Sequence, residues 1–113
     1  MNSMQEKLYE AAKSVLNPRK LNDYAEAGGV GAAILSESGK IYTGVCIDIA
    51  CSVGFCAEHS AAAAMVTAGE SKILMVVAVD WDGSIMPPCG RCREFLTSLD
   101  AENRNPQVLL PDG

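Results

Sequence analysis

Residues 73–79 have the sequence Ile-Leu-Met-Val-Val-Ala-Val and lie between two charged residues, Lys72 and Asp80. A continuous apolar run that is rich in β-branched side chains is typical of a β-strand covered on both faces of its sheet. The run is also far shorter than the roughly 20 apolar residues that a membrane-spanning helix needs. We therefore expect a buried central strand here, with other elements packed on both sides of it.

The segment before this strand, residues 57–68, is rich in alanine on every side and is followed by Gly69. Alanine is the strongest helix former, and glycine commonly follows the last turn of a helix. A helix with apolar residues all round is typical of a buried position. The pattern predicts a central helix that is buried on all sides.

Two further apolar segments, residues 30–35 and 41–47, flank the turn sequence Ser-Glu-Ser-Gly at residues 36–39. They predict an antiparallel hairpin. Near the N-terminus, Ser3 and Glu6 have the spacing of a capping box, which predicts the start of a helix that stops before Asn17-Pro18. Its apolar residues recur at helical spacing: Met4, Leu8, Ala11, Ala12, Val15 and Leu16.

After a turn at residues 81–84, Pro87-Pro88 introduces a third predicted helix, and residues 107–110 predict a last short strand. The predicted order α-β-β-α-β-α-β indicates an α/β fold with helices on both faces of a sheet. We expect a three-layer α/β/α sandwich with a mixed β-sheet, formed by a single domain over residues 1–113. The apolar face of the third helix comprises Cys92, Phe95, Leu96 and Leu99.

The composition limits the classes of partner. Fourteen acidic and nine basic side chains give a net charge of −5, which argues against binding of a nucleic acid polymer and favours a small-molecule ligand. The N-terminal residues lack the basic start and apolar centre of a signal peptide, so we expect no membrane association and a reducing, cytoplasmic location. In that setting the five cysteines are better read as metal ligands or buried thiols than as disulfides.

Three of the cysteines stand at the starts of two predicted helices. Cys56 opens residues 57–68, whereas Cys89 and Cys92 lie in Pro88-Cys89-Gly90-Arg91-Cys92. A Cys-x-x-Cys pair can be a redox pair or half of a structural zinc site, and the latter needs further ligands to close the tetrahedron. The remaining candidates, Cys46, Cys51 and His59, form no second ligand pair.

Three protein ligands with one open position are the arrangement of a catalytic zinc site, whose open position holds an acidified water. Glu58 lies two residues after Cys56, where a carboxylate can take a proton from that water and deliver it to a leaving amine. A purely structural zinc site has no need of a carboxylate at this position.

The combination of Cys56-Ala57-Glu58 with Pro88-Cys89-Gly90-Arg91-Cys92 resembles the cytidine deaminase family, and especially its small homotetrameric nucleoside branch with three cysteine ligands. Residues 30–35, 41–50 and 108–113 also resemble that branch. The resemblance implies one zinc ion held by Cys56, Cys89 and Cys92, with Glu58 shuttling protons. It further implies hydrolysis at C4 of a cytosine-like ring with loss of ammonia, in a homotetramer or homodimer.

Other residues are assigned around this centre. We expect Arg91 and Arg93 to hydrogen-bond the ligand sulfurs and His59 to support or pack beside the site, with a ligand role for His59 as the alternative. Trp81 either walls the pyrimidine pocket or packs at its rim. Cys46 and Cys51 are expected to be small buried side chains. The substrate-binding candidates are Cys46, Asp48, Ala57 and Trp81.

The chain departs from the nucleoside branch in its expected sugar site. That branch carries an aromatic residue and an Asn-x-Glu sequence where this chain has Gly28, Cys46 and Asp48. The segments around Thr43-Gly44-Val45 and Pro88–Arg93 also resemble blasticidin S deaminase. We therefore expect weaker discrimination between cytidine, deoxycytidine and sugar-modified cytosines, unless Asp48 or a neighbouring subunit restores the sugar contacts.

Family members continue beyond the position that matches Gly113, so we expect this form to lack their C-terminal segment. The leading hypothesis is a zinc-dependent hydrolytic deaminase of cytidine, deoxycytidine or a cytosine nucleoside analogue such as blasticidin S. The alternatives are an aminopurine or free-base deaminase with the same zinc core, and an inactive zinc-stabilised binding protein.

Overall fold

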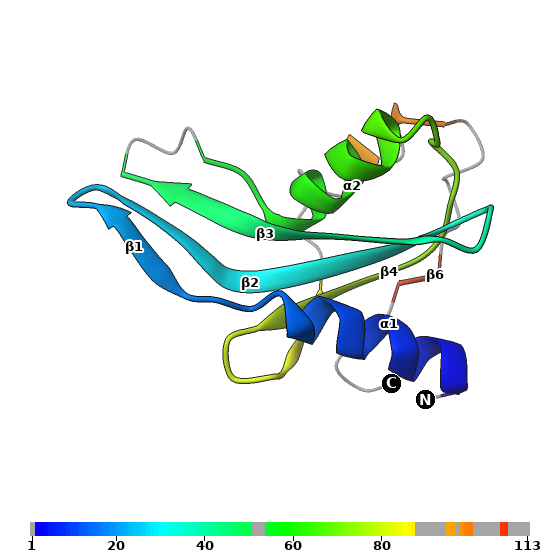
Figure 1. The fold of residues 1–113 in the computed structure, drawn as a ribbon, viewed down its shortest axis with the longest axis horizontal. Coiled ribbons are helices and arrows are strands. Elements are labelled where there is room, and N and C mark those ends of the chain that lie inside the picture. The colour runs from blue at the N-terminus through cyan, green and yellow to red at the C-terminus, as the bar shows by residue number, and fades with distance from the viewer. Residues whose placement is uncertain (1, 51–53, 88–94, 97, 101–106, 109–113) are drawn as a thin grey trace.

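The structure is a computed structural model that describes residues 2–50, 54–87, 95–96, 98–100 and 107–108. Helices α1 and α2 lie on opposite sides of a β-sheet (Figure 1), which confirms the expected α/β architecture. Most of the third predicted helix lies outside the described residues, although Phe95, Leu96 and Ser98 are helical. The elements are α1 (Ser3–Ser14), β1 (Arg19–Asn22), β2 (Ala25–Ser36), β3 (Ile41–Ile49), α2 (Ala57–Thr67), β4 (Ile73–Asp80), β5 (Ile85–Met86) and β6 (Gln107–Val108).

The sheet is organised around β2. The long strand β2 pairs with β3 along one edge, while β1 and β4 pair with successive parts of its other edge. Strand β4 continues the sheet by pairing with β5 and β6. All of these pairings are antiparallel except that of β4 with β6, which is parallel, so the expectation of a mixed sheet is confirmed.

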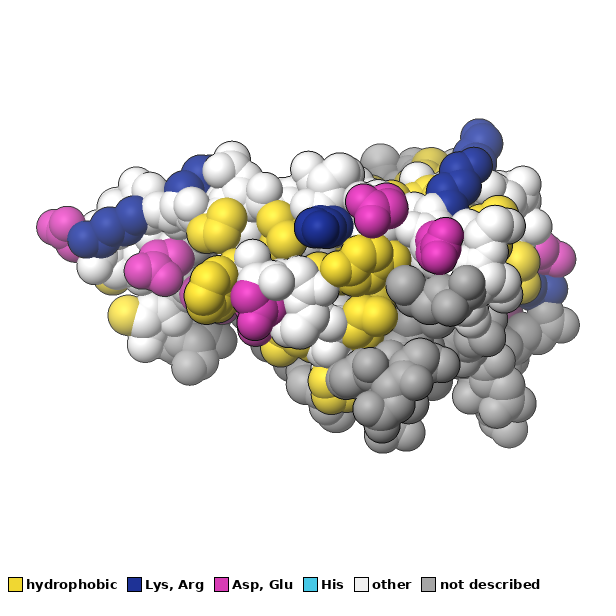
Figure 2. All heavy atoms as spheres, turned by 90° about the horizontal axis from the view of Figure 1, so that it is seen from below, with side chains coloured by type: hydrophobic (Ala, Val, Ile, Leu, Met, Phe, Trp, Pro, Cys, Tyr) yellow, Lys and Arg dark blue, Asp and Glu magenta, His cyan; other side chains and the backbone are white. Residues whose placement is uncertain are grey.

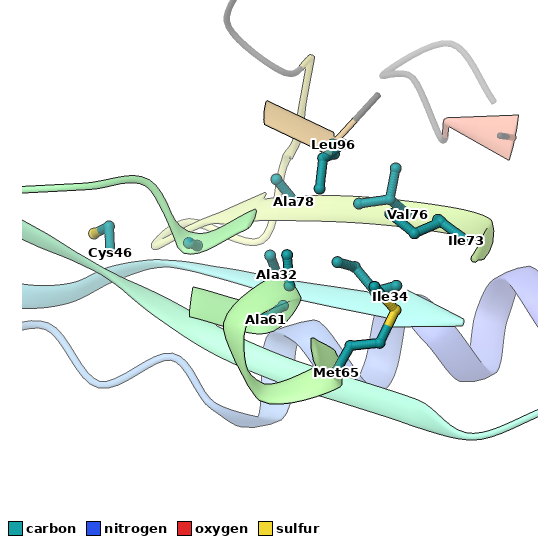
Figure 3. Close-up of a cluster of buried hydrophobic side chains, with 11 residues drawn as sticks. Ala32, Ile34, Cys46, Ala61, Met65, Ile73, Val76, Ala78 and Leu96 are labelled. Atoms are coloured by element: carbon teal, nitrogen blue, oxygen red, sulfur yellow. The ribbon is translucent and has the colours of Figure 1, made fainter. Parts of the chain in front are cut away.

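Two hydrophobic clusters fill the spaces on the two faces of the sheet. Because side chains alternate along a strand, Ala32 and Ile34 of β2 join the cluster below α2, whereas Ala33 and Leu35 join the one against α1. Figure 3 shows the first cluster, in which Met65 of α2 points toward the side chains of β2 and β4. Strand β4 contributes to both clusters, as its continuous apolar sequence predicts.

Helix α2 packs very closely on β3 because the strand has a glycine at the contact. A Cβ atom at Gly44 would lie 2.4 Å from the backbone nitrogen of Ala61, well inside van der Waals contact. The hydroxyl of Ser60 also donates to the carbonyl of Val45 on β3, at 2.7 Å. This contact fixes the first turns of α2 against the middle of β3.

The structure corrects two expectations about the helices. The N-cap of α1 is Asn2, which forms the capping box with Gln5, rather than Ser3 with Glu6. Both pairs have the required spacing, but the helix begins one residue earlier than expected. Helix α2 is not buried on all sides, since Ala63, Ala64 and Val66 are exposed. Alanine favours helix at any position, so its abundance did not indicate which faces would be covered.

The hairpin that begins the sheet is also longer than the apolar pattern predicts. Strand β2 starts at Ala25 instead of Val30, and the mostly polar residues 19–22 form β1. Hydrogen bonds between the paired backbones stabilise these strands where apolar and polar side chains do not alternate regularly. On the face that carries α1, acidic, basic and apolar side chains are interspersed (Figure 2). Among the described residues, we find no helix long and apolar enough to cross a membrane.

Candidate active site

A cavity of about 370 Å³ opens between β3 and the N-terminal end of α2. Five residues that the sequence marks as site residues line it: Cys46, Asp48, Cys56, Ala57 and Glu58. The first two come from β3, and the others from the start of α2. Tertiary structure thus brings together two segments that are separated in the chain, and each contributes a thiol and a carboxylate to the lining of one cavity.

The position of Cys56 is fixed by the strand-like residues before it. Phe55 forms an isolated bridge with Ile47, with backbone N–O distances of 2.9 and 3.0 Å. A Cβ atom at Gly54 would lie 1.9 Å from the carbonyl oxygen of Ile47, so only glycine fits this approach. The chain is therefore tied to β3 immediately before Cys56, which is extended and serves as the N-cap of α2.

The start of α2 offers an electropositive position to anionic groups. The Cys56 side chain makes no capping hydrogen bond to the helix amides, and the N-terminus of a helix carries a partial positive charge. Glu58 lies in the first turn with 5% of its surface exposed. A thiolate and a carboxylate are both favoured at this end of a helix, so the residue types suit the place.

Of the predicted zinc ligands, only Cys56 belongs to the described part of the chain. Cys89, Cys92, Arg91 and Arg93 lie outside it, as does Cys51, and no group of three potential ligands is present among the residues that are described.

The described residues on either side of this gap nevertheless lie beside α2. Pro87 lines the cavity, and Phe95 packs against His59 in the first turns of α2, with ring centroids 4.3 Å apart. The described residues before and after Cys89 and Cys92 thus lie at the cavity and against α2, respectively. Of the described residues, Cys56 offers a thiol at the electropositive start of α2, a donor type that suits zinc.

His59 and Trp81 occupy different environments. His59 is 9% exposed, makes an edge-to-face contact with Phe95, and has an Nε2 atom without a hydrogen-bond partner among the residues described. Trp81 follows β4, is 70% exposed and is not among the residues that line the cavity. His59 is therefore buried one residue after Glu58 without lining the cavity, and Trp81 is exposed and does not line it either.

Cys46 is more than a small apolar side chain. Its thiol is 6% exposed and donates to Oδ2 of Asp48 at an Sγ–O distance of 3.6 Å. Burial raises the pKa of this thiol, and the nearby Asp48 carboxylate raises it further, against the opposing effect of backbone N–H groups of Val30 and Gly29. Cys46 and Asp48 are therefore a coupled pair on the cavity wall.

Sequence reasoning did not identify the apolar lining of the cavity. Phe55, Val30 and Met86 all border it. Phe55 directly precedes Cys56, so its proximity could have been inferred from adjacency. Met86 comes to the cavity only because β5 pairs with β4, opposite Ala78, and no local pattern in the sequence indicates that pairing.

Comparison with known proteins shows the family to which the chain belongs. Residues 2–104 match the family model described as "Cytidine and deoxycytidylate deaminase zinc-binding region". A cytidine deaminase from Mycobacterium tuberculosis is 37% identical over 68 residues, which are 59% of this chain and 51% of the relative. A probable cytidine deaminase from Dictyostelium discoideum is 38% identical over 68 residues, 58% of this chain and 46% of that protein. The chain thus matches about half the length of these curated relatives.

Solved structures extend the similarity to the whole fold. The crystal structure of cytidine deaminase from Mycobacterium leprae superposes with a TM-score of 0.81 and 26% identity, covering 99% of this chain and 92% of that one. The enzyme from M. tuberculosis gives a TM-score of 0.79 and 25% identity, covering 98% and 88% of the two chains. With the family model matching nearly all of the sequence, the chain belongs to the cytidine and deoxycytidylate deaminase family, in its zinc-binding region.

Proposed function

We propose that this protein is a zinc-dependent hydrolytic deaminase that converts a cytidine-like nucleoside to the uridine-like product and ammonia. The observation that carries the proposal is the burial of Glu58 in a cavity whose wall also contains Cys56, both at the start of α2. Burying a carboxylate costs free energy, so its presence at the cavity favours a chemical role for it. The family match and the similarity to cytidine deaminases support the same activity.

Cys56, Cys89 and Cys92 would hold one zinc ion per chain. When bound, zinc supplies a Lewis acid that makes a water acidic near neutral pH. Glu58 then acts as the proton carrier: its carboxylate accepts the proton that the nucleophilic water loses and donates a proton to the departing amine. Its position in the first turn of α2, rather than in a loop, holds that carboxylate in a fixed orientation.

The remaining walls of the cavity suit a flat heterocycle with a polar substituent. Val30, Phe55 and Met86 provide apolar surface that can contact the faces of a ring and exclude water. Asp48 provides a carboxylate at the cavity wall, an acceptor that suits a sugar hydroxyl. A substrate contact by Trp81 stays a prediction, because this residue does not line the cavity.

Measured ammonia release from a panel of compounds tests the activity. The panel contains cytidine, deoxycytidine, cytosine, blasticidin S, adenosine and guanine. We expect turnover of one or more cytosine nucleosides and none of the purines. If the protein turned over only a purine, or only free cytosine, the assignment to cytosine nucleosides would be overturned. If zinc-loaded protein turned over none of the six compounds, the result would favour a binding protein.

We also propose that the protein works as a homotetramer or homodimer. Its described surface exposes Val66 on α2 and Leu74 on β4, each 47% exposed, and apolar side chains of this size favour contacts between subunits. Light scattering coupled to size-exclusion chromatography measures the mass in solution. A monomeric mass at micromolar concentration would contradict this assignment.

A further inference from the structure

Two cysteines lie opposite each other where β3 meets the residues before α2. Phe55 and Ile47 form an antiparallel bridge, in which each backbone N–H donates to the carbonyl of the other residue, at 2.9 and 3.0 Å. In an antiparallel pair, one step forward along one segment matches one step back along the other. The bridge therefore sets Cys56 opposite Cys46.

Contacts on both sides of this pair keep the register. Before Cys56, a Cβ atom at Gly54 would lie 3.2 Å from the Cα atom of Asp48. After Cys56, the hydroxyl of Ser60 donates to the carbonyl of Val45, at 2.7 Å. The segment that contains Cys56 thus follows β3 closely over the residues that bracket the two cysteines.

The spacing of residues in this register suits a disulfide. Because Phe55 and Ile47 exchange both of their hydrogen bonds, the next pair is of the kind without hydrogen bonds, whose Cα atoms lie about 4.5 Å apart in a regular antiparallel ladder. Disulfides join cysteines whose Cα atoms are roughly 4.4–6.8 Å apart. The register of Cys46 and Cys56 is therefore one that a disulfide can span.

The two cysteines differ in how a reagent can reach them. Both line the same cavity, and both carry thiols in the structure. Cys56 is partly exposed, whereas Cys46 is 6% exposed and donates to Oδ2 of Asp48 at 3.6 Å. A thiol is a weak donor, so little is lost when Cys46 turns from Asp48 to another rotamer. A small molecule in the cavity therefore meets Cys56 first, and Cys46 is placed to react second.

We propose that Cys46 and Cys56 form a reversible disulfide, by exchange with a low-molecular-weight disulfide that enters the cavity, and that this bond competes with metal binding at Cys56. The pairing of the two cysteines does not depend on the proposed deaminase function. The competition rests on the assignment of Cys56 as a zinc ligand.

The exchange proceeds in two balanced steps. The Cys56 thiolate attacks one sulfur of the reagent RSSR, so that a mixed disulfide forms and one thiolate RS⁻ leaves. The Cys46 thiolate then attacks the sulfur of Cys56, which forms the protein disulfide and releases a second RS⁻. The two protein thiols are oxidised, the reagent is reduced to two thiols, and the two protons that the protein loses pass to the released thiolates. An excess of thiol reverses both steps.

The bond acts as a switch because two states require the same sulfur. Zinc binds cysteine as the thiolate, and a sulfur in a disulfide cannot serve in that way. Oxidation therefore removes one of the three predicted ligands, and bound metal in turn withholds Cys56 from the reagent. The metal content of the protein would then follow the thiol–disulfide balance of its surroundings.

Peptide mapping of the wild-type protein tests the pairing. Metal-free protein is incubated with 2-hydroxyethyl disulfide, and its remaining thiols are then alkylated. Cleavage before Asp48 and after Phe55 places the three cysteines of this region on separate fragments, so mass spectrometry identifies which of them are linked. We expect a link between Cys46 and Cys56 that dithiothreitol breaks. Linkage of either residue to a different cysteine, or mixed disulfides with the reagent alone, would overturn the proposal.

The rate of bond formation tests the competition with metal. Zinc-loaded protein should form the disulfide about tenfold more slowly, or slower still, than metal-free protein, because bound metal stabilises the reduced state by mass action. Oxidised protein should take up little added zinc, as measured by elemental analysis, and should regain its zinc capacity after dithiothreitol. Equal rates with and without zinc would overturn the competition.

Two cysteine variants provide matched controls. Cys46→Ala removes one partner and should abolish the link, and Cys46→Val, which keeps more of the side-chain volume, should do the same if the alanine variant folds poorly. Cys51→Ala should leave both the link and its rate unchanged. A loss of linkage in the Cys51 variant would contradict the assignment of partners. None of these measurements uses catalytic turnover, so their outcome is independent of whether the protein deaminates a nucleoside.

Discussion

The two ends of helix α2 contrast in how they use polar groups. At the C-terminal end, Gly69 has a φ of +94°, and the N–H groups of Gly69 and Glu70 donate to the carbonyls of Val66 and Met65, at 2.9 and 3.1 Å. This is a Schellman cap, one of the favoured ways to end a helix. At the N-terminal end, a cysteine stands where serine, threonine, aspartate or asparagine would stabilise the helix.

The carboxylates near the two ends of α2, Glu70 and Glu58, also differ in their surroundings. Beyond the C-terminal end, the Glu70 carboxylate accepts hydrogen bonds from Tyr42 and from Ser36, a fully buried residue of β2. This network connects α2 to the β2–β3 hairpin. At the N-terminal end, Glu58 is buried and lines a cavity. The Glu70 carboxylate therefore serves the fold, whereas the Glu58 carboxylate is the one to which we assign proton transfer in the proposed function.

The largest expected effect follows from exchanging the two carboxylates for amides. Glu58→Gln should lower kcat about 10²–10⁴-fold, because the amide cannot carry the proton. Zinc content by elemental analysis and thermal stability should be retained. The matched variant Glu70→Gln should leave kcat unchanged. Comparable turnover in the Glu58 variant would remove its assigned role.

Cys56→Ser tests whether the N-terminal end of α2 gives up stability for metal binding. The variant should lose most of the bound zinc, because serine is a poor zinc ligand. In metal-free protein the same change should stabilise α2 by about 1 kcal/mol, since serine is a favoured N-cap. Elemental analysis and urea unfolding with a chelator measure the two effects. Full zinc occupancy in the variant would contradict the ligand assignment.

A smaller effect is expected where α2 meets β3, midway between its ends. Gly44→Ala places a Cβ atom 2.4 Å from the backbone of α2, so the helix must shift, and the cost should be about 1–3 kcal/mol. At Gly29 a Cβ would meet nothing within 4 Å, which makes Gly29→Ala the matched control. Equal destabilisation of the two variants in urea would show that close packing at Gly44 is unimportant.

The smallest expected effect concerns the pH dependence of the network at the C-terminal end. Hydrogen bonds from Tyr42, and then from Ser38 and Ser36, lower the pKa of Glu70. A carboxyl whose pKa is lower in the folded protein contributes stability above its unfolded pKa and loses it as the pH falls through the folded value. Glu70→Gln should therefore flatten the acid side of the stability profile.

Thermal unfolding from neutral to acid pH measures this change, and Tyr42→Phe should reproduce part of it. The same hydrogen bond raises the pKa of Tyr42, with further contributions from burial and from the charge of Glu70. The wild-type network is therefore also expected to weaken at strongly alkaline pH, as the pH rises through the raised pKa of the phenol. An unchanged acid profile in both variants would show that the network contributes little.

Much of the fold could be predicted from local patterns. The continuous apolar run of β4 and the alanine-rich composition of α2 identified both elements to within a residue or two. The proximity of Cys56 and Glu58 could likewise be predicted, since residues two positions apart at the start of a helix must lie close together. These features depend on neighbouring residues, whose relative placement the backbone geometry of a helix or strand already dictates.

Other features depended on contacts between distant segments. The sequence alone determined β4, α2 and the chemical identity of Cys56 and Glu58, and it named Cys46 both as a small buried side chain and as a substrate-binding candidate. The place of Cys46 opposite residues 28–30 of β2 arises from the register of β2 against β3. The place of Met86 in the cavity wall and the exposure of one face of α2 also depend on contacts between distant segments. The register of paired strands and the coverage of helix faces are set by the packing of whole elements, so only the tertiary structure decided them.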